Sequence, residues 1–505
     1  MPSTERKTYM NTSNGKIPRR AFCRGVLATA LACRLPKTTC AVSDPQPPNV
    51  LFLAVDDLRP ELGCFGATYA QTPSIDKLAA SGVRFTNHFV QVPTCGASRY
   101  ALLTGRSPGN SGVTSSNAAF YQGNAALSTA RLDAAQSMPE LFRRNSYHTV
   151  CIGKVSHTPD GRVFGYDGKG RGQPEVPHAW DELATPYGKW ERGWGAFFAY
   201  EGGRHREDGQ GHTDLMEFKA EKDEDLPDGL LAQAAVEKLR EIKDTGKPFF
   251  LAVGFYKPHL PFVGTRGDWE AMSQVDVPVA PHQEKPDSAY WHESGEFYRY
   301  DAPFAKDRPL ASESQRKTKR AYLACVRYVD RQIGKVLTAL EDLGLAANTV
   351  VVLWGDHGWH LGDSQIWGKH TPFERAVHSP LIIRTPGRHS AGLSCDALVE
   401  TLDLYPTLID LCSLRDTHVA HALDGQTLSP LLRDTKANVR EAAVSYWRSA
   451  ISIRTRTHRL IADHGGDTPS SIELYDIRKS WDPLDNCARE EPELVEHLLG
   501  YVSGG

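Results

Sequence analysis

The protein has 505 residues, with 58 lysines and arginines against 61 aspartates and glutamates, and 40% of its residues are hydrophobic. This apolar fraction supports a sizeable buried core, and the length fits several domains or one large α/β domain with a smaller companion. A formal net charge of −3 excludes a generally basic nucleic-acid-binding protein. Beyond the amino-terminal leader, no segment reaches the ~18 consecutive apolar residues of a membrane span, so we expect a soluble protein without a transmembrane segment.

Residues 1–44 are predicted to be an export signal and linker. Arg19, Arg20 and Phe22 resemble the twin-arginine pattern, and a short apolar run follows them up to Cys33. These features predict an exported protein, periplasmic or extracellular, and Cys33 leaves a lipid anchor open. The alternative is a disordered basic tail.

Four apolar, β-branched runs are predicted to be strands buried on both faces, at 50–55, 148–152, 249–255 and 349–354. Helical patterns separate them, at 74–80, 228–242 and 314–343. Alternating strands and helices are typical of a parallel, doubly wound α/β sheet.

Each predicted strand is followed by side chains that can bind a metal or an anion: Asp56 and Asp57, then Lys154 and His157, then His259 of a Lys-Pro-His sequence, and finally Asp356 and His357. In open α/β sheets the ligand lies beyond the carboxyl ends of the strands. We therefore expect these groups to meet at one edge of the sheet.

Two long irregular segments interrupt the pattern, at 158–225 and 263–312. The first is polar and glycine-rich, so we expect an insertion over the site, with its tryptophans packed inside the loop rather than stacked on a sugar. Short strands at 443–447, 450–455, 459–462 and 473–476, followed by a helix at 491–502, predict a small antiparallel sheet with one helix. The expected organisation is a catalytic domain over 45–434 and a C-terminal α+β subdomain over 435–505.

The segment from Cys95 to Arg106 carries the most information. Cys95 stands where a loop is predicted to enter a helix, and Arg99 follows one turn later. The positive end of a helix favours an anionic ligand or a reactive thiolate.

Cys95-Gly96-Ala97-Ser98-Arg99 followed by Leu103-Thr104-Gly105-Arg106 resembles the motif of the type I sulfatases. The strand-end groups and Lys369 follow in that family's order, and the Asp-His-Gly-Trp and Lys-Pro-His sequences most resemble the iduronate-2-sulfatase branch. The resemblance implies an alkaline-phosphatase-like fold, with a large, mostly parallel mixed sheet between helices. Many members have proline where Ala97 stands here, which leaves open which maturation enzyme recognises the site.

The resemblance also implies the chemistry. Cys95 would be converted by a maturation enzyme to formylglycine, whose hydrate attacks sulfur and leaves a covalent sulfo-enzyme intermediate. Asp56, Asp57, Asp356 and His357 would bind a divalent ion together with residue 95, Ca²⁺ rather than Mg²⁺ because carboxylate-rich sites suit the larger ion. The implied catalytic groups are Arg99, Lys154, His157, His259 and Lys369, and His360 and His370 are candidate substrate contacts.

Charge supports an anionic substrate. Three carboxylates and one divalent ion leave about −1, and Arg99, Lys154 and Lys369 bring the site to about +2. The expected activity is hydrolysis of sulfate esters on a sulfated carbohydrate. Two alternatives stay open: a phosphonate or phosphodiester hydrolase of the same superfamily, and a non-catalytic binder of sulfated glycans.

Overall fold

The computed structural model describes residues 47–301, 303, 307–387, 390–464, 469–480 and 485–503. They belong to one compact unit, Gln46–Gly505. The predicted export signal, with its twin-arginine and lipid-anchor features, lies outside the described residues. Within the described ranges, no helix combines the length and the apolar character needed to cross a bilayer.

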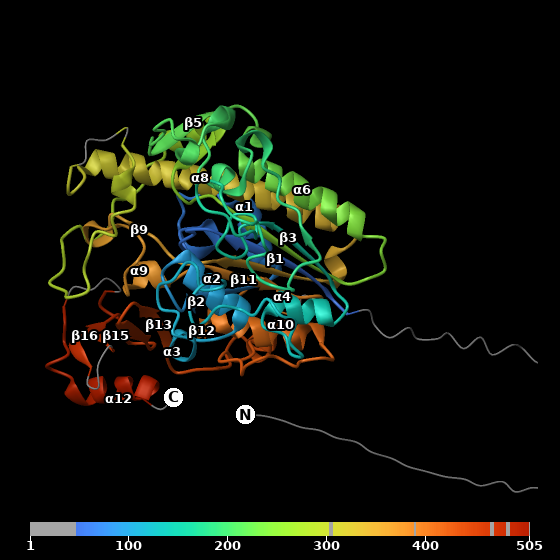
Figure 1. The fold of residues 1–505 in the computed structure, drawn as a ribbon. Coiled ribbons are helices and arrows are strands. Elements are labelled where there is room, and N and C mark those ends of the chain that lie inside the picture. Colours follow the sequence, from blue (N-terminus) through green and yellow to red (C-terminus); the bar gives the residue numbers. More distant parts are fainter. Residues whose placement is uncertain are drawn as a thin grey trace, which may run out of the picture. The chain divides into compact units, whose positions relative to one another are not determined.

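An eight-stranded sheet forms the centre of this unit, with the strand order β12-β2-β11-β8-β1-β6-β3-β4 (Figure 1). Neighbouring strands are parallel except on both sides of β11. The bounds are β1 Asn49–Val55, β2 Val83–Phe89, β3 His148–Gly153, β4 Glu182–Leu183, β6 Phe249–Phe255, β8 Thr349–Gly355, β11 Leu381–Arg384 and β12 Leu393–Glu400. The four predicted strands are confirmed as the adjacent strands β8, β1, β6 and β3.

Helices cover both faces of the sheet because side chains along its buried strands alternate between two cores. Leu51 and Leu53 of β1 join one hydrophobic cluster, and Val50 and Phe52 join the other. The first face carries α1 (Pro73–Ser81), α6 (Pro227–Ile242) and α8 (Ser312–Asp342), and the second carries α2 (Cys95–Thr104), α4 (Met138–Arg144) and α10 (Leu404–Cys412) (Figure 1). The three predicted helices correspond to α1, α6 and α8.

The segment 158–225 forms α5 (Gly193–Phe197) and β5 (Met216–Ala220), and β5 pairs with β7 (Phe262–Thr265), which precedes α7 (Arg266–Ser273). Trp190 and Trp194 are held by hydrogen bonds within the segment, as predicted, although Trp194 also lines a cavity, whereas Trp180 packs against Phe250 of β6. The indole N–H of Trp190 donates to the carbonyl of Tyr200 (2.9 Å), and that of Trp194 donates to the carbonyl of Phe164 (2.9 Å).

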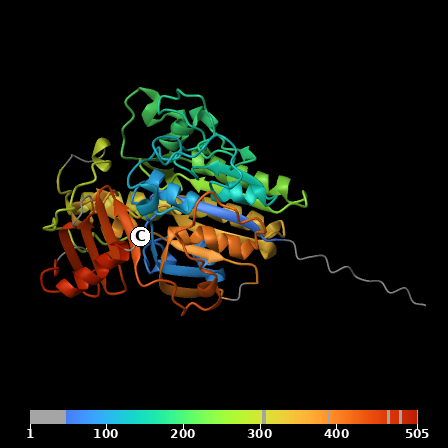
Figure 2. The same cartoon turned by 60° about the horizontal axis from the view of Figure 1, so that its bottom comes forward.

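The chain ends in a four-stranded antiparallel sheet, whose strands lie side by side in chain order in Figure 2. Its elements are β13 (Ala443–Trp447), β14 (Ala450–Arg454), β15 (His458–Asp463), β16 (Ser470–Asp476) and the final helix α12 (Pro492–Ser503). The predicted antiparallel sheet and helix are confirmed. Strand β13 contacts the segment after β2, where Ser445 Oγ donates to the carbonyl of Val90 (2.6 Å). The domain boundary near 434 stays a prediction.

Candidate active site

The predicted strand-end groups of β1 and β8 lie together. Val55 of β1 is paired in register with Gly355 of β8, which brings the residues that follow them side by side. The backbone N–H of Asp57 donates to Asp356 Oδ1 (3.0 Å), and the carboxylates are fully buried. The expectation that these groups meet at one sheet edge is met.

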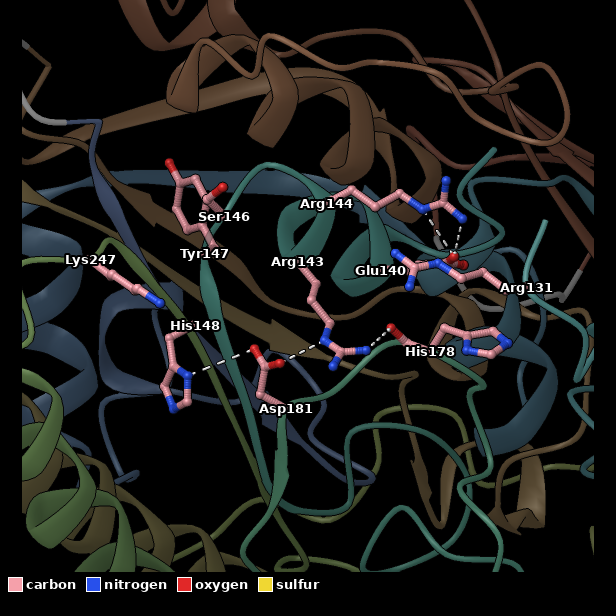
Figure 3. Close-up of a pocket in the computed structure, with 10 residues that line it drawn as sticks. All are labelled: Arg131, Glu140, Arg143, Arg144, Ser146, Tyr147, His148, His178, Asp181 and Lys247. Carbon is pink, nitrogen blue, oxygen red and sulfur yellow. Dashed lines mark hydrogen bonds and ion pairs between the residues drawn. The ribbon is translucent and has the colours of Figure 1, made fainter. Parts of the chain in front are cut away.

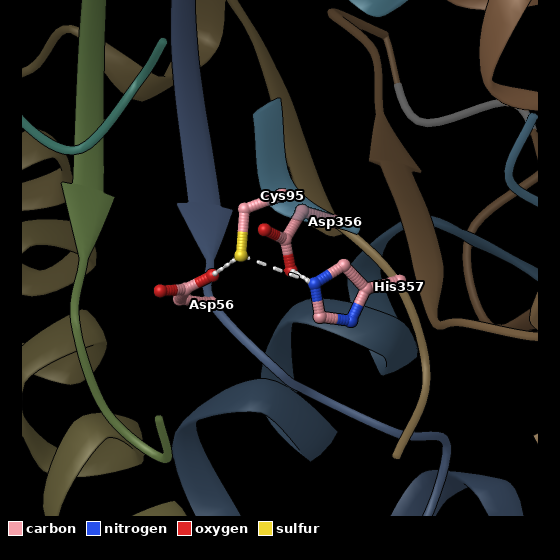
Figure 4. A group of neighbouring side chains, drawn as sticks. All are labelled: Asp56, Cys95, Asp356 and His357. Atoms are coloured by element: carbon pink, nitrogen blue, oxygen red, sulfur yellow. Dashed lines mark hydrogen bonds and ion pairs between the residues drawn. The ribbon is translucent and has the colours of Figure 1, made fainter. Parts of the chain in front are cut away.

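Cys95 is the first residue of α2 and points into this group of acids (Figure 4). Its Sγ lies 3.3 Å from Asp56 Oδ1 and 3.3 Å from His357 Nε2. Glycine is required at the next position, because a Cβ on Gly96 would lie 2.4 Å from the Cα of Asn117. The Gly96 N–H donates to Asn117 Oδ1 (2.8 Å), which fixes the start of the helix.

The helix start does not make Cys95 a reactive thiolate. Burial, and next the neighbouring Asp56, raise the pKa of this thiol to about 12. Burial therefore disfavours the thiolate form of an unmodified Cys95.

Each carboxylate of the group has its own buried cation. The pairs are Lys154 Nζ with Asp56 Oδ2 (2.7 Å), Lys369 Nζ with Asp57 Oδ1 (2.6 Å), and Arg99 Nη2 with Asp356 Oδ2 (2.9 Å). Buried charges are stable only when paired, so these six side chains form a balanced set. A divalent cation added to this set would make it net positive.

The pKa values of Asp56 and Asp57 are shifted in opposite directions. Burial would raise the pKa of Asp56, but Lys154, His259 and Arg99 outweigh it and hold that pKa well below its usual value. At Asp57, burial raises the pKa well above the usual range despite the attraction of Lys369, and Asp56 contributes. Asp57 Oδ2 is buried without a hydrogen-bond partner. This carboxyl therefore has an unused ligand atom and would be stabilised as the anion by a further cation.

The donor set fits a hard divalent ion. Donor atoms of Asp56, Cys95, Asp356 and His357 all lie within 4.8 Å of one another. His357 Nδ1 is 3.0 Å from the carbonyl oxygen of Gly358, which can only accept a hydrogen bond. The neutral ring therefore carries its proton on Nδ1 and directs the lone pair of Nε2 toward the acids, as a metal ligand requires.

The group opens into a cavity of about 580 Å³, which we call the catalytic cavity. Six predicted site residues line it: Cys95, Lys154, His157, His259, Lys369 and His370. Behind this surface, Asp56, Asp57 and His357 contact the lining side chains. Arg99 and Asp356, which bond to each other, do not line the cavity either. A cavity of this size accommodates a small molecule or one end of a chain.

His157 and His259, two of the histidines that line the cavity, are buried. Burial lowers the pKa of His157 well below its usual value, and Lys154 lowers it further; its Nδ1 is buried without a hydrogen-bond partner. His259 Nδ1 faces the carbonyl oxygen of Leu260 (2.6 Å). Burial, then Lys369, lowers the His259 pKa to about 4.

The two candidate substrate contacts are placed differently. His370 lines the cavity, where its ring stacks on Trp447 with centroids 5.0 Å apart. His360 is buried, its Nε2 lies 2.9 Å from Thr371 Oγ1, and it does not line the cavity. The short strand β9 (His360–Leu361), paired with β10 (Trp367–Gly368), turns His360 inward, so we do not retain it as a substrate contact.

Several lining residues were missed from the sequence. Glu296 lies in the irregular segment 263–312, with Oε1 3.3 Å from His259 Nε2 and Oε2 3.6 Å from Lys369 Nζ. Arg206 and the Trp447-Arg448 turn of the C-terminal sheet also line the cavity. None of them follows a buried strand of the main sheet. The sequence offered one signal for the Trp447-Arg448 turn: an aromatic and a basic residue stand side by side at the predicted hairpin turn near 448.

Another cavity, of about 370 Å³, lies at the opposite end of β3 (Figure 3). There Arg143 pairs with Asp181 (2.6 Å) and Arg144 with Glu140 (2.7 Å). His148, the first residue of β3, lines it, whereas Lys154 follows the last residue of this strand in the catalytic cavity. None of the predicted catalytic side chains reaches this second cavity.

Comparisons with known proteins agree with the geometry. The sulfatase family model matches residues 48–414, and a model described as N-sulphoglucosamine sulphohydrolase, C-terminal, matches 355–498. The chain is 31% identical to iduronate 2-sulfatase of Mus musculus over 431 residues, covering 76% of this chain and 74% of that protein. It is 33% identical over 402 residues to a sulfatase of Formosa agariphila, covering 76% and 73%.

A solved structure extends the comparison to the fold. The phosphonate monoester hydrolase of Agrobacterium radiobacter superposes with a TM-score of 0.70 at 23% identity, covering 90% of this chain and 94% of that one. At this identity the likeness shows the shared alkaline-phosphatase-like fold alone. The family match spans most of the chain, and the acids, cysteine and cations of the family motif meet at one sheet edge. The chain belongs to the sulfatase family and is a sulfuric ester hydrolase.

Proposed function

We propose that this enzyme hydrolyses sulfate esters of a sulfated carbohydrate, with a nucleophile made from Cys95 by conversion to formylglycine. One observation carries the proposal: Cys95 Sγ lies 3.3 Å from both Asp56 Oδ1 and His357 Nε2 and 3.4 Å from Lys369 Nζ, at the inner end of an open cavity. A side chain at this point adjoins metal ligands and a cation at once, as attack on a sulfate group requires.

Asp56, Asp57, Asp356 and His357 would hold the divalent ion, and oxygen-rich ligation favours Ca²⁺. When bound, the ion and the hydrated aldehyde would supply a Lewis acid and an oxygen nucleophile. The unpartnered Oδ2 of Asp57 and the Nε2 lone pair of His357 support this ligand set.

Lys154 and Lys369 provide positive charge on two sides of Cys95. Burial would lower the pKa of Lys369, but Asp57 and Cys95 outweigh it and hold that pKa well above its usual value, so the ammonium stays charged. Once the carboxylates neutralise a metal, both ammonium groups can donate hydrogen bonds to sulfate oxygens. Arg99 is completely buried and keeps Asp356 in place through a bond from Nε (3.0 Å).

Proton transfer falls to the histidines and Lys369. His157 is neutral, and its Nδ1 has no partner, so we assign it the role of accepting a proton at residue 95 during release of sulfate. Lys369 or His259 would stabilise or protonate the oxygen of the departing alcohol. Both lie on the wall of the cavity.

The outer cavity supports a carbohydrate substrate. Trp447 offers a flat ring, and Arg206, whose guanidinium lies 3.5 Å from the centroid of the Phe198 ring, supplies fixed positive charge. Sugars bind through flat apolar faces and hydrogen bonds to hydroxyl groups. Among the sequence relatives are iduronate 2-sulfatase and an N-acetylglucosamine-6-O-sulfatase of Bacteroides thetaiotaomicron. Export, a maturation enzyme for Cys95 and a separate subdomain over 435–505 belong to the same proposal.

The test compares matched substrates. Purified, matured enzyme is assayed on 4-methylumbelliferyl sulfate, on the corresponding phosphonate monoester and phosphodiester, and on defined sulfated saccharides. We expect kcat/KM to be highest for sulfate esters, with some sulfated saccharide preferred over the aryl ester. A preference of orders of magnitude for the phosphonate or phosphodiester would instead establish the rival activity.

A further inference from the structure

A third cavity, of about 670 Å³, lies where the loop after β1, strand β2 and the end of β14 meet; we call it the arginine cavity. Arg59, Arg84, Arg375 and Arg454 line it, with Glu374 as the one carboxylate. In the described part of the chain it shares no lining residue with the catalytic cavity.

The arginines of this cavity share their acidic partners. Glu374 Oε2 accepts from Arg454 Nε (3.1 Å) and from Arg459 Nε (3.0 Å). Asp363 bonds in the same way to Arg59 (2.9 Å) and Arg375 (3.0 Å). One carboxylate neutralises one cation, so each shared acid leaves one positive charge over.

Neighbouring groups do not remove this excess. Glu61 is itself shared between Arg59 and Lys319, and Asp76 lies behind the lining residue Cys64. Even without Arg375, the described residues of this set hold five cations (Arg59, Arg84, Arg454, Arg459 and Lys319) and four carboxylates (Glu61, Asp76, Asp363 and Glu374), which leaves one positive charge. The whole chain has the opposite sign, at −3.

Arg84 has unused hydrogen-bonding capacity. It donates to Ser394 Oγ (3.1 Å), and its guanidinium lies 5.7 Å from the centroid of the Phe65 ring. Its Nε is buried without a hydrogen-bond partner. Among the described residues, no carboxylate forms an ion pair with Arg84. The planar fork of an arginine matches the oxygens of a tetrahedral oxyanion.

We propose that the arginine cavity is a second binding site for a sulfate group, distinct from the site where sulfate is hydrolysed. The link to a saccharide rests on the proposed function. Strand β14 joins the two cavities: Arg448, just before it, lines the catalytic cavity, and Arg454, its last residue, lines the arginine cavity. The five residues of β14 span about 15 Å, so a multiply sulfated oligosaccharide is long enough to extend from one cavity to the other.

Cys64 provides a local measurement. It is a free, partly exposed thiol that lines the arginine cavity. The full-length chain with Cys95→Ala, which prevents turnover, is treated with N-ethylmaleimide, and alkylation of the Cys64 peptide is followed by mass spectrometry. The probes are sodium sulfate, with sodium chloride of equal ionic strength as control, and a sulfated hexasaccharide, with its desulfated form as control.

We expect protection by the sulfated probe and none by its control. With a probe at about four times its Kd, the alkylation rate falls about fivefold by mass action. Protection by sodium sulfate identifies the free ion as sufficient, and protection by the hexasaccharide alone identifies a saccharide-borne group. Equal rates with all four solutes would overturn the proposal.

Two variants assign the effect. Arg84→Ala, and Arg84→Gln as a milder change, should abolish protection without lowering Tm, because Arg84 has no ion pair with any carboxylate that the structure describes. Arg131→Ala is the matched control, since Arg131 lines the separate cavity of Figure 3. Protection that survives both Arg84 variants, or that Arg131→Ala removes equally, would contradict a specific site. Failure of the proposed function would appear differently: the matured enzyme without any substitution would not hydrolyse sulfate esters.

Discussion

The inner and outer parts of the catalytic cavity are built differently. The inner part consists of Cys95 and the surrounding acids and cations, which follow buried strands or begin a buried helix and are paired one to one. The outer part comes from insertions and from the C-terminal sheet, through residues such as Arg206, Glu296 and Trp447. Tyr166, on the same wall, is 48% exposed.

This difference separates two functions. Groups held by the central sheet have little freedom, and they act on the sulfate group that every substrate shares. Groups on loops vary without disturbing the core, and they contact what differs between substrates. A substitution in the inner part should therefore affect every substrate equally, whereas one in the outer part should affect large substrates selectively.

Asp356→Asn should have the largest effect. It keeps the shape of the side chain but removes the charge of a proposed metal ligand and leaves Arg99 without its nearest anion (2.9 Å). We expect kcat to fall by about 10³-fold or more on aryl and saccharide sulfates alike. Asp396→Asn, at an exposed acid, is the control. Wild-type activity that persists in metal-free buffer would show that this cluster does not act through a metal.

Lys369→Met should come next. The substitution preserves the aliphatic stem and removes the ammonium group beside Cys95 and Asp57. We expect kcat to fall about 100-fold for all sulfate esters, because one fixed positive donor is lost, while Tm of the metal-bound enzyme changes little. Kinetics and thermal unfolding of the same preparation decide this. Proportional losses of activity and stability would assign Lys369 a structural role instead.

Trp447→Ala should distinguish between substrates. Its ring stacks on His370 at the wall of the cavity and contacts no predicted metal ligand. We expect KM for a preferred sulfated saccharide to rise about tenfold, with kcat/KM for 4-methylumbelliferyl sulfate nearly unchanged. Trp269→Ala, remote on α7, is the matched control. Equal losses on both substrates would remove the distinction between inner and outer parts.

Metal removal should have the smallest effect on stability. Each carboxylate of the inner part already has a cation within 2.9 Å, so the metal-free fold contains no isolated buried charge there. We expect chelation to abolish activity but to lower Tm by only about 2–4 °C. Differential scanning calorimetry with and without chelator measures this. A loss of tens of degrees would mean that the metal, rather than the lysines and the arginine, holds the acids together.

The sequence predicted the inner part well because its signals are local. Asp56 and Asp356 directly follow apolar runs, and parallel strands must bring such positions to one edge. The pairing of each acid with one cation was not predictable, since it depends on contacts between residues such as Lys369 and Asp57, 312 positions apart. Glu296 lies in an irregular segment without periodicity. His360 was misplaced because a short hairpin directs its ring inward.

The most direct test of the central claim is the mass of the peptide that contains residue 95, taken from enzyme that turns over sulfate esters. The account predicts a formylglycine mass at this position, in a fraction that rises in proportion to kcat when preparations are matured to different extents. A fully active preparation whose residue 95 is entirely an unmodified thiol would contradict it, and a uniformly free thiol without activity would favour a non-catalytic glycan binder.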